Sequence, residues 1–267
     1  MSDTQPLAES HPAAALLAAI RARTPARILV GRAGASYRTA TQLTLRQDHA
    51  FARDAVHAEV SLENDLGADL VRRYSLFEVA SRASTKEQYL LRPDLGRQLD
   101  GPAREAVRSR CPSGADLQVV VGDGLSAAAV AAQVPALLPR LEEETRRRGW
   151  SLGQPFFVRH CRVGILNDVG DLLGPQVVVL FIGERPGLAT AESLSAYLAY
   201  RPKSGDTDAH RNLISNIHAR GVRVEEAAPR ILALADQMRR RQASGVAVKE
   251  ELPGSPAAML PERREDA

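Results

Sequence analysis

Short apolar runs alternate with helix-like segments from about residue 117 onward. The runs lie at residues 117–121, 156–159 and 177–182. Almost continuous apolar composition over so few residues is typical of strands that are buried on both faces of a parallel sheet. A further strand is predicted at residues 213–217, and helices at residues 127–132, 135–148 and 225–242. The alternation favours an α/β fold with a Rossmann-like, mostly parallel sheet flanked by helices.

The N-terminal part of the chain is predicted to be mostly helical. Apolar residues recur at helical spacing at residues 39–58, 66–71 and 100–110, and a short strand-like run lies at residues 76–79. We therefore predict three segments. They are a helical N-terminal region at residues 1–110 that packs on the core, a Rossmann-like core with the C-terminal helix at residues 111–246, and a flexible tail at residues 247–267.

Composition narrows the class of protein. The chain has 267 residues, of which 44% are apolar and 25% are charged, as in ordinary globular proteins. A net charge of +3 and an aromatic content of 4% disfavour nucleic-acid binding. The two cysteines, Cys111 and Cys161, are too few for a disulfide framework and suit a reducing cytosol. The apolar run at residues 13–20 follows acidic residues and precedes arginines, so it predicts a short amphipathic helix rather than a secretory signal.

The segment Gly183-Glu184-Arg185-Pro186-Gly187 directly follows the third apolar run. A strand that ends there places a carboxylate and a guanidinium at the carboxyl edge of the sheet, where open α/β folds bind their ligands. Exposed charges more often pair with each other or are solvated. The proline and the glycines nevertheless favour a loop that contacts a ligand, because they fix an unusual backbone path. A helix is predicted to begin near Glu192.

The turn after the first apolar run, Gly122-Asp123-Gly124-Leu125-Ser126-Ala127, matches one form of the dinucleotide-binding fingerprint. One hypothesis is therefore that the protein is a nicotinamide-dependent oxidoreductase that uses the loop from Gly122 to Gly124. No acidic residue follows the next strand, near Arg159 and His160, to hold a ribose, which argues against this hypothesis. The simpler interpretation is a tight turn in which Asp123 or Ser126 caps the following helix.

Catalytic constellations are not evident in the sequence. The six histidines show no metal-ligand spacing, and there is no nucleophile elbow and no phosphate-binding P-loop. Asp208-Ala209-His210 begins like the Asp-x-His-x-x-Gly motif of base-off cobalamin proteins, but Leu213 occupies the final position. His218 is interpreted either as lining the site or as a hydrogen-bonded structural histidine. We predict no catalytic residue and no metal ligand in this chain.

An ordered set of phrases resembles one known family, from about Ile28 to about Val246. The first phrases are Gly31-Arg32-Ala33-Gly34, Asp48-His49-Ala50 and Tyr89-Leu90-Leu91-Arg92-Pro93-Asp94-Leu95-Gly96-Arg97. The later ones are Val119-Val120-Val121-Gly122-Asp123-Gly124-Leu125-Ser126, Pro155-Phe156-Phe157-Val158-Arg159, Gly183-Glu184-Arg185-Pro186-Gly187-Leu188, Glu192-Ser193-Leu194-Ser195 and Ile214-Ser215-Asn216-Ile217-His218. Together they closely resemble the small (light) subunit of adenosylcobalamin-dependent ethanolamine ammonia-lyase.

This resemblance implies an ammonia-lyase that converts ethanolamine to acetaldehyde and ammonia by a radical mechanism. Homolysis of the cobalt–carbon bond of adenosylcobalamin gives the radical that abstracts hydrogen from the substrate. A large subunit with a (β/α)8 barrel holds ethanolamine, and the small subunit closes over the cobalamin at the interface between them. The family enzyme contains several copies of each chain. No nucleic-acid or membrane partner is implied.

The resemblance also implies three cofactor-binding residues, Val163, Glu184 and Leu213. In relatives a cysteine can occupy the position of Leu213, so contact through packing or backbone would suit leucine, whereas a required sulfur would not. We expect Glu184 to accept a hydrogen bond from a corrin amide. The expected location is cytoplasmic. A bacterial microcompartment is the alternative location. Relatives found in such compartments can carry a longer N-terminal extension with a targeting helix, and the run at residues 13–20 could serve as a short helix of this kind.

Overall fold

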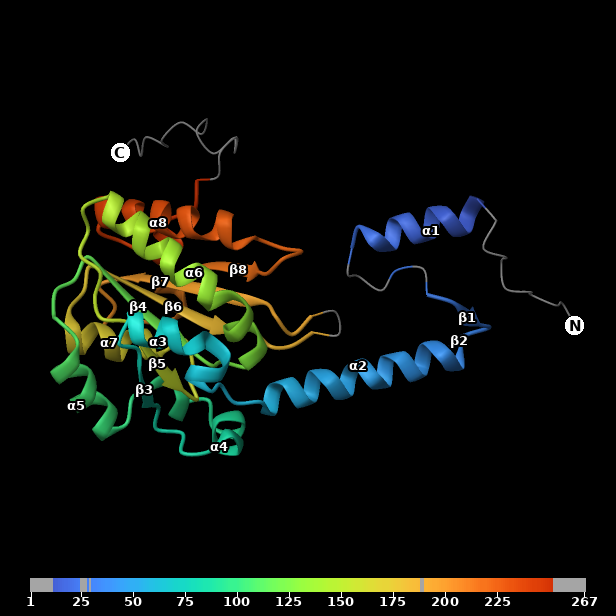
Figure 1. The fold of residues 1–267 in the computed structure, drawn as a ribbon, viewed down its shortest axis with the longest axis horizontal. Helices are drawn as coiled ribbons and strands as arrows, with labels where there is room; N and C mark the ends of the chain where they lie inside the picture. Colours follow the sequence, from blue (N-terminus) through green and yellow to red (C-terminus); the bar gives the residue numbers. More distant parts are fainter. Residues whose placement is uncertain (1–11, 25–27, 29, 188–189, 252–267) are drawn as a thin grey trace, which may run out of the picture.

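A six-stranded sheet forms the centre of the molecule (Figure 1). The computed structural model describes residues 12–24, 28, 30–187 and 190–251. In spatial order the strands are β3 (Phe77–Ala80), β5 (Phe156–Arg159), β4 (Leu117–Gly122), β6 (Val177–Gly183), β7 (Leu194–Tyr200) and β8 (Asn212–Ile217). The first four run parallel, whereas β7 is antiparallel to β6, and β8 is antiparallel to β7. The predicted Rossmann-like α/β fold is confirmed, with a mixed sheet.

Helices cover the two faces of the sheet unequally. One face packs against α6 (Ala127–Arg147), α8 (Val224–Arg241), α3 (Ala68–Arg73) and the π-helical turn at Leu62–Gly67. The other packs against α5 (Gly101–Arg110) and α7 (Ile165–Leu173). The buried residues of this second layer come from β3, β4, β5 and β6, but none comes from β7 or β8. On that side Leu213 and Ser215 of β8 are exposed, whereas Ser195 and Ala199 of β7 are buried.

Two prolines lie inside α6, and they do not interrupt it. The prediction that a second helix starts at Pro135 was wrong, because one helix spans Ala127–Arg147 and contains both Pro135 and Pro139. Proline removes a backbone hydrogen bond from a helix interior. Packing outweighs that loss here, since Val134, Leu137 and their neighbours on one side of the helix are completely buried against the sheet.

Strand β7 replaces the helix that was predicted to begin near Glu192. The segment is rich in leucine and alanine, which favour helices. Its apolar residues alternate, however, so that Leu194, Ala196 and Leu198 are buried on the α8 side while Ser195 and Tyr197 lie on the opposite side. A period of two is the period of a strand. The helix prediction was wrong because the alternating spacing, rather than the leucine- and alanine-rich composition, determines the local structure.

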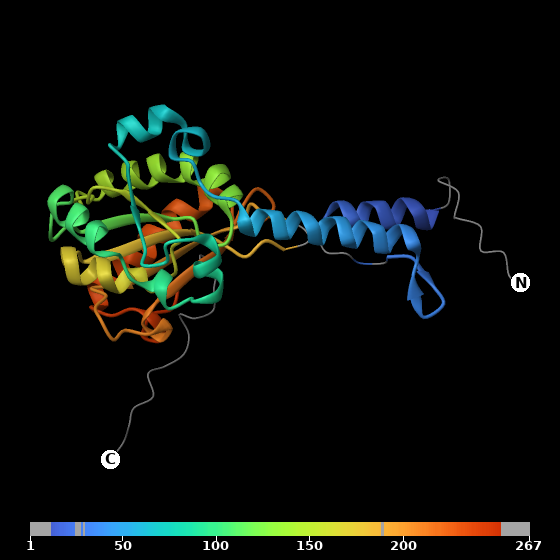
Figure 2. The same ribbon diagram turned by 90° about the horizontal axis from the view of Figure 1, so that it is seen from below.

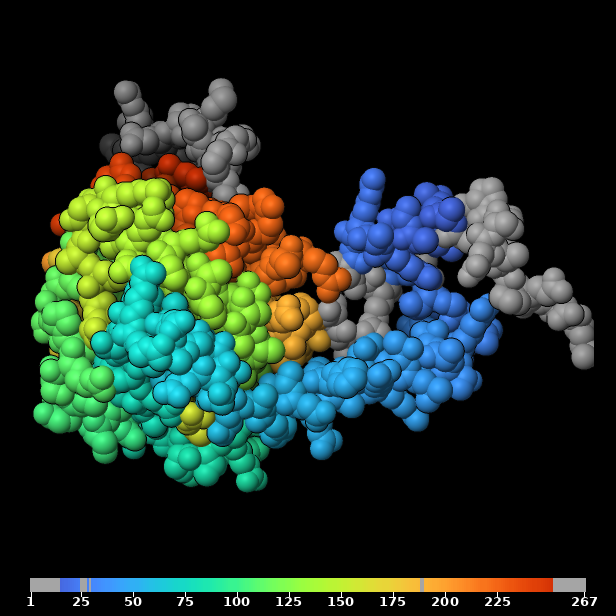
Figure 3. All heavy atoms as spheres, in the orientation of Figure 1, coloured from blue at the N-terminus to red at the C-terminus, as the bar shows by residue number. Residues whose placement is uncertain are grey.

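The N-terminal elements extend away from the body of the molecule (Figures 2 and 3). They are α1 (Pro12–Ala22), the short strands β1 (Arg32–Ala33) and β2 (Ser36–Tyr37), and α2 (Thr39–His57). No residue of α2 is buried, and Leu43 and Phe51 on it are 59% and 60% exposed. The predicted helices at residues 39–58, 66–71, 100–110 and 225–242 are confirmed with small shifts of their ends.

Short elements complete the chain. They are α4 (Lys86–Leu91) and the 3-10 helices Leu95–Arg97, Asp208–His210 and Gly245–Ala247. Val248 is 1% exposed and packs on the core, while residues 252–267 of the predicted tail lie outside the described residues. The division into segments at residues 110 and 246 stays a prediction. Within the described ranges no helix is long and apolar enough to cross a bilayer.

Candidate binding pocket

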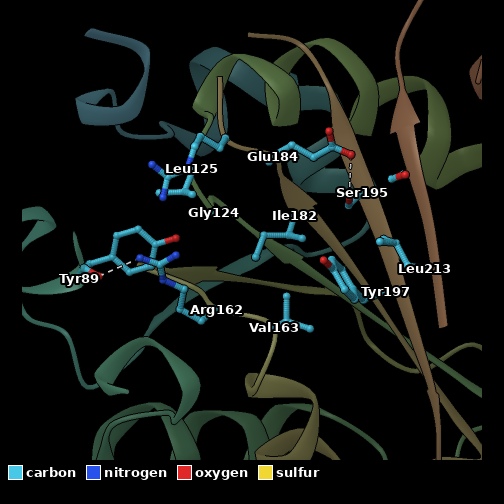
Figure 4. A pocket seen from close by; sticks show the side chains of 13 residues that line it. Tyr89, Gly124, Leu125, Arg162, Val163, Ile182, Glu184, Ser195, Tyr197 and Leu213 are labelled. Atoms are coloured by element: carbon cyan, nitrogen blue, oxygen red, sulfur yellow. Dashed lines mark hydrogen bonds between the residues drawn. The ribbon is translucent and has the colours of Figure 1, made fainter. Parts of the chain in front are cut away.

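A pocket of about 350 Å³ lies beside β7 and β8, on the side of the sheet opposite α8 and next to the carboxyl ends of β4 and β6 (Figure 4). The three residues singled out from the sequence, Val163, Glu184 and Leu213, all line it. Tyr89 and Arg162 form the opposite side of the opening in the close-up view. Segments far apart in the sequence therefore converge here, at the sheet edge where α/β folds bind ligands.

The three residues lie on different elements of the fold. Val163 lies in the loop between β5 and α7, and Glu184 directly follows the last residue of β6. Leu213 lies near the start of β8 and pairs with Tyr197 of β7. The antiparallel pairing places both side chains on the face of the sheet opposite α8, where Leu213 remains 45% exposed. Its apolar side chain is thus available for packing against a ligand.

Glu184 is held by donors from both antiparallel strands and from the segment before them. Its Oε2 accepts a hydrogen bond from the Ser193 hydroxyl at 2.7 Å, and its Oε1 accepts one from the Ser195 hydroxyl at 2.7 Å. The backbone N–H of Asn216 donates to the same Oε1 at 2.8 Å. In the part of the chain that the structure describes, no ion pair joins Glu184 to Arg185. The carboxylate is therefore fixed in position in the lining of the pocket.

His218 does not line the pocket; it contacts Asn216, which in turn holds Glu184. It is 5% exposed, and its Nε2 lies 2.7 Å from Oδ1 of Asn216, the residue whose N–H donates to Glu184. Its Nδ1 accepts from the backbone N–H of Arg220 at 3.2 Å. Of the two interpretations offered from the sequence, the structural one holds. Asn216 itself has a left-handed backbone (φ 61°), which asparagine tolerates better than most residues.

Asp123 does not cap α6; it holds the loop that carries Val163. Its Oδ2 and Oδ1 accept hydrogen bonds from the backbone N–H groups of His160 and Cys161, at 2.9 and 2.8 Å. The carboxyl is completely buried, and Lys86 Nζ lies 3.9 Å from it. Burial raises the pKa of Asp123, and the Lys86 ammonium and the two N–H groups oppose that shift. The helix cap is Ser126, whose hydroxyl accepts from the N–H of Ala129 at 3.2 Å.

The glycines of the β4–α6 turn are required by packing. Gly124 has φ 59°, and a Cβ there would lie 2.3 Å from the Gly183 carbonyl oxygen. A Cβ on Gly122 would lie 2.6 Å from the Cys161 side chain. The turn is thus pressed against β6 and the loop after β5. The fingerprint match has this steric explanation, so the nicotinamide hypothesis is not favoured.

Cys161 is a packing residue in this environment. It is fully buried and does not line the pocket. Burial, together with the neighbouring Asp123 charge, raises the pKa of its thiol well above the ordinary value. A neutral buried thiol is a poor nucleophile, so the residue is not suited to redox chemistry.

Comparison with known proteins identifies the family. The profile of the family described as Ethanolamine ammonia-lyase light chain (EutC) matches residues 14–249. The chain belongs to this family. The expected resemblance is thereby confirmed over most of the sequence.

Individual relatives of the ethanolamine ammonia-lyase family agree with the profile. A protein of Clostridium perfringens described as ethanolamine ammonia-lyase small subunit is 42% identical over 230 residues, covering 86% of this chain and 76% of the relative. A protein of Pseudomonas fluorescens with the same description is 45% identical over 236 residues, covering 87% of this chain and 86% of the relative. The family is one of ammonia-lyase subunits, and a small subunit implies a large-subunit partner.

Several pocket residues of this ethanolamine ammonia-lyase family member were not predicted as site residues. They are Tyr89, Arg162, Ser195, Tyr197 and Ser215. The alternation of apolar and polar residues along β7 could have placed Ser195 and Tyr197 on the face opposite the core. Nothing in the local sequence of Tyr89 indicates that its ring lies beside the loop after β5, because that contact depends on the tertiary fold.

Proposed function

We propose that this chain binds adenosylcobalamin through the pocket described above and closes over it at the interface with the large subunit of ethanolamine ammonia-lyase. The assembled enzyme, with several copies of each chain, converts ethanolamine to acetaldehyde and ammonia by a radical mechanism. The observation that supports the proposal is the convergence of Val163, Glu184 and Leu213 on one pocket. Those positions are the cofactor contacts that the family resemblance implies.

The chemistry of the pocket fits a corrin ring. A corrin presents a flat apolar framework edged by amide side chains. Val163, Ile182 and Leu213 supply apolar packing surface, and the Glu184 carboxylate together with the hydroxyls of Ser195 and Ser215 supplies hydrogen-bonding groups. When bound, adenosylcobalamin supplies the radical through homolysis of its cobalt–carbon bond. The role of this chain is to hold and orient the cofactor, and ethanolamine is held mainly by the large subunit.

The experiment that tests the function is reconstitution. Acetaldehyde release from ethanolamine and adenosylcobalamin is measured with the large subunit alone and with the large subunit plus this chain. We expect activity only in the mixture. A well-folded mixture that co-purifies but releases no acetaldehyde would contradict the proposed reaction. Tight binding of NAD by the isolated chain would instead revive the nicotinamide hypothesis.

Glu184 provides a sharper test of the pocket. Glu184→Gln keeps the size of the side chain but replaces one acceptor oxygen with a donor, so we expect cobalamin to bind the assembled enzyme about tenfold more weakly. Affinity is measured by equilibrium dialysis and corrin absorbance. Glu192→Ala, an exposed carboxylate on the neighbouring loop, is the matched control and should bind normally. Equal affinities for the Glu184 variant and the control would remove Glu184 from the binding site.

We further propose a cytoplasmic location, with a bacterial microcompartment as the alternative. The segment that would address such a compartment is the N-terminal apolar run at residues 13–20, which lies in α1. Fusion of residues 1–30 to a fluorescent protein, expressed with and without compartment shell proteins, distinguishes the two locations.

A further inference from the structure

Two arginines, Arg162 and Arg185, line the pocket close to Tyr89. Both lower the pKa of the Tyr89 hydroxyl by their charge, against the larger effect of burial, which raises it. The shared pocket lining, rather than these shifts, places the two guanidiniums in the same neighbourhood. In the close-up view Arg162 and Tyr89 lie on one side of the pocket, and Glu184 and Ser195 lie on the other (Figure 4).

Arg162 is held rigidly in this position. Its Cζ lies 4.1 Å from the centre of the Tyr89 ring, and its Nη2 donates to the Tyr89 carbonyl oxygen at 3.1 Å. The ring is fixed in turn, because the Tyr89 hydroxyl donates to the Cys161 carbonyl oxygen at 3.0 Å. The Arg162 Nε is buried without a partner, so the donors that can reach a ligand are those on its two terminal nitrogens.

Neither guanidinium has an acidic partner among the described residues. Of the five N–H donors on the Arg162 guanidinium, only one at Nη2 has a protein acceptor within those residues. Glu184, the acid that lines the same pocket, is engaged by serine hydroxyls and a backbone N–H instead. Arg159 shows the contrast, since it pairs with both Glu78 and Glu59. Two uncompensated cations in one pocket favour an anionic ligand.

We propose that Arg162 and Arg185 form an anion subsite that binds the phosphodiester of the cofactor's nucleotide loop. This inference rests on the proposed binding of cobalamin. The amide side chains of a corrin are neutral, so the phosphodiester is the cofactor group whose charge matches two guanidiniums. Arginine binds phosphate oxygens in pairs, with charge-assisted hydrogen bonds. The arginines lie on one side of the pocket, and Glu184 and the serines lie on the other. This separation of charge fixes the orientation in which the cofactor binds.

The test compares two ligands that differ in this group. Cyanocobalamin carries the nucleotide loop and its phosphodiester, whereas cyanocobinamide lacks both. Affinities for the complex of this chain with its large subunit are measured by ultrafiltration and corrin absorbance. Arg162→Met and Arg185→Met should each weaken cyanocobalamin binding about 10- to 100-fold, while cyanocobinamide affinity stays within about twofold. Arg162→Lys, which keeps the charge but loses the planar fork, should fall between.

The control is Arg201→Met. Arg201 is also exposed and also stacks on a tyrosine, with its Cζ 5.7 Å from the Tyr200 ring, but it follows β7 at the opposite end from the pocket. It should bind both ligands as the wild type does. Because Arg185 is exposed as well, its variant keeps the test informative even if Arg162→Met folds poorly.

Three outcomes would overturn the subsite. Equal losses for both ligands would assign the arginines to general packing, and unchanged affinities would exclude them from binding. Loss of co-purification with the large subunit, at unchanged cofactor affinity of the remaining complex, would assign them to an acidic surface of the partner. If the wild-type complex binds neither corrinoid, the proposed function itself fails, and that result is distinct from the other three.

Discussion

Replacing Asp123 with alanine should lower the free energy of unfolding by about 3–5 kcal/mol, one of the largest effects available in this chain. The substitution leaves two buried backbone N–H groups, those of His160 and Cys161, without their acceptors. It also leaves the Lys86 ammonium without its buried counter-charge, in a place where burial already lowers the pKa of Lys86. Removing one member of a buried pair is costly because the other charge stays desolvated.

Function should suffer together with stability, because Arg162 and Val163 directly follow the two N–H groups that Asp123 holds. His160 has a left-handed backbone (φ 55°), so this loop depends on its anchor to keep an uncommon conformation. We expect cobalamin affinity of the assembled enzyme to fall even at temperatures where the variant remains folded. Rescue is expected in part for Asp123→Asn, which keeps one acceptor oxygen.

Urea unfolding followed by circular dichroism measures the stability effect. Asp69→Ala is the control, since the Asp69 side chain is 97% exposed and its loss should change stability by less than about 0.5 kcal/mol. In a double-mutant cycle with Lys86→Met, the combined variant should lose less than the sum of the two single losses. Strict additivity would show that Lys86 and Asp123 do not act as a pair.

The parts of the fold that the sequence predicted well are those with a single strong signal. β6 is an unbroken apolar run and β4 is apolar except for Gln118, and every residue of both strands is buried. Strands of this composition must be buried on both faces of the sheet. When strands and helices alternate along the chain, this burial is achieved by a parallel sheet with helices on each side. The capping of α6 by Ser126 is likewise local and was among the alternatives predicted.

The errors arose where long-range packing decides the local structure. Pro135 is tolerated inside α6 because the helix side that contains Leu137 and Leu138 is buried, a fact that local propensity does not contain. β7 pairs with β6 over its whole length, from Val177 with Tyr200 to Gly183 with Leu194. Antiparallel pairing of this kind ends the parallel part of the sheet, and residues of both antiparallel strands line the pocket.

The candidate site divides in the same way. Val163, Glu184 and Leu213 came from a family resemblance that extends along most of the chain, and all three line one pocket. Arg162 and Asp123 were not predicted in their present roles. The role of Arg162 depends on the lack of an acidic partner among the described residues. The role of Asp123 depends on the backbone N–H groups of a loop that is distant in the sequence. Such relations arise only when separate strands are brought together.

Replacing Gly183 with alanine should destabilise the protein by about 3 kcal/mol and weaken cobalamin binding. A Cβ at this position would lie 2.1 Å from the Ser126 carbonyl oxygen and 2.7 Å from that of Asp123, so backbone would have to move. Both oxygens belong to the turn between β4 and α6. The turn cannot shift freely, because Asp123 holds the loop after β5 and the Ser126 hydroxyl donates to the Ala191 carbonyl oxygen at 2.5 Å.

The strain of this substitution would act next to Glu184, which follows Gly183 directly, and this is why affinity and stability should fall together. Gly101→Ala is the matched control, because a Cβ at Gly101 meets no atom within 4 Å and alanine suits the first turn of α5. The control should unfold at the wild-type urea midpoint or above it. If Gly183→Ala also unfolded at the wild-type midpoint, the backbone of the β4–α6 turn would be able to move away from β6 at little cost in free energy. The positioning of Glu184 would then have to come from Ser193, Ser195 and Asn216 alone.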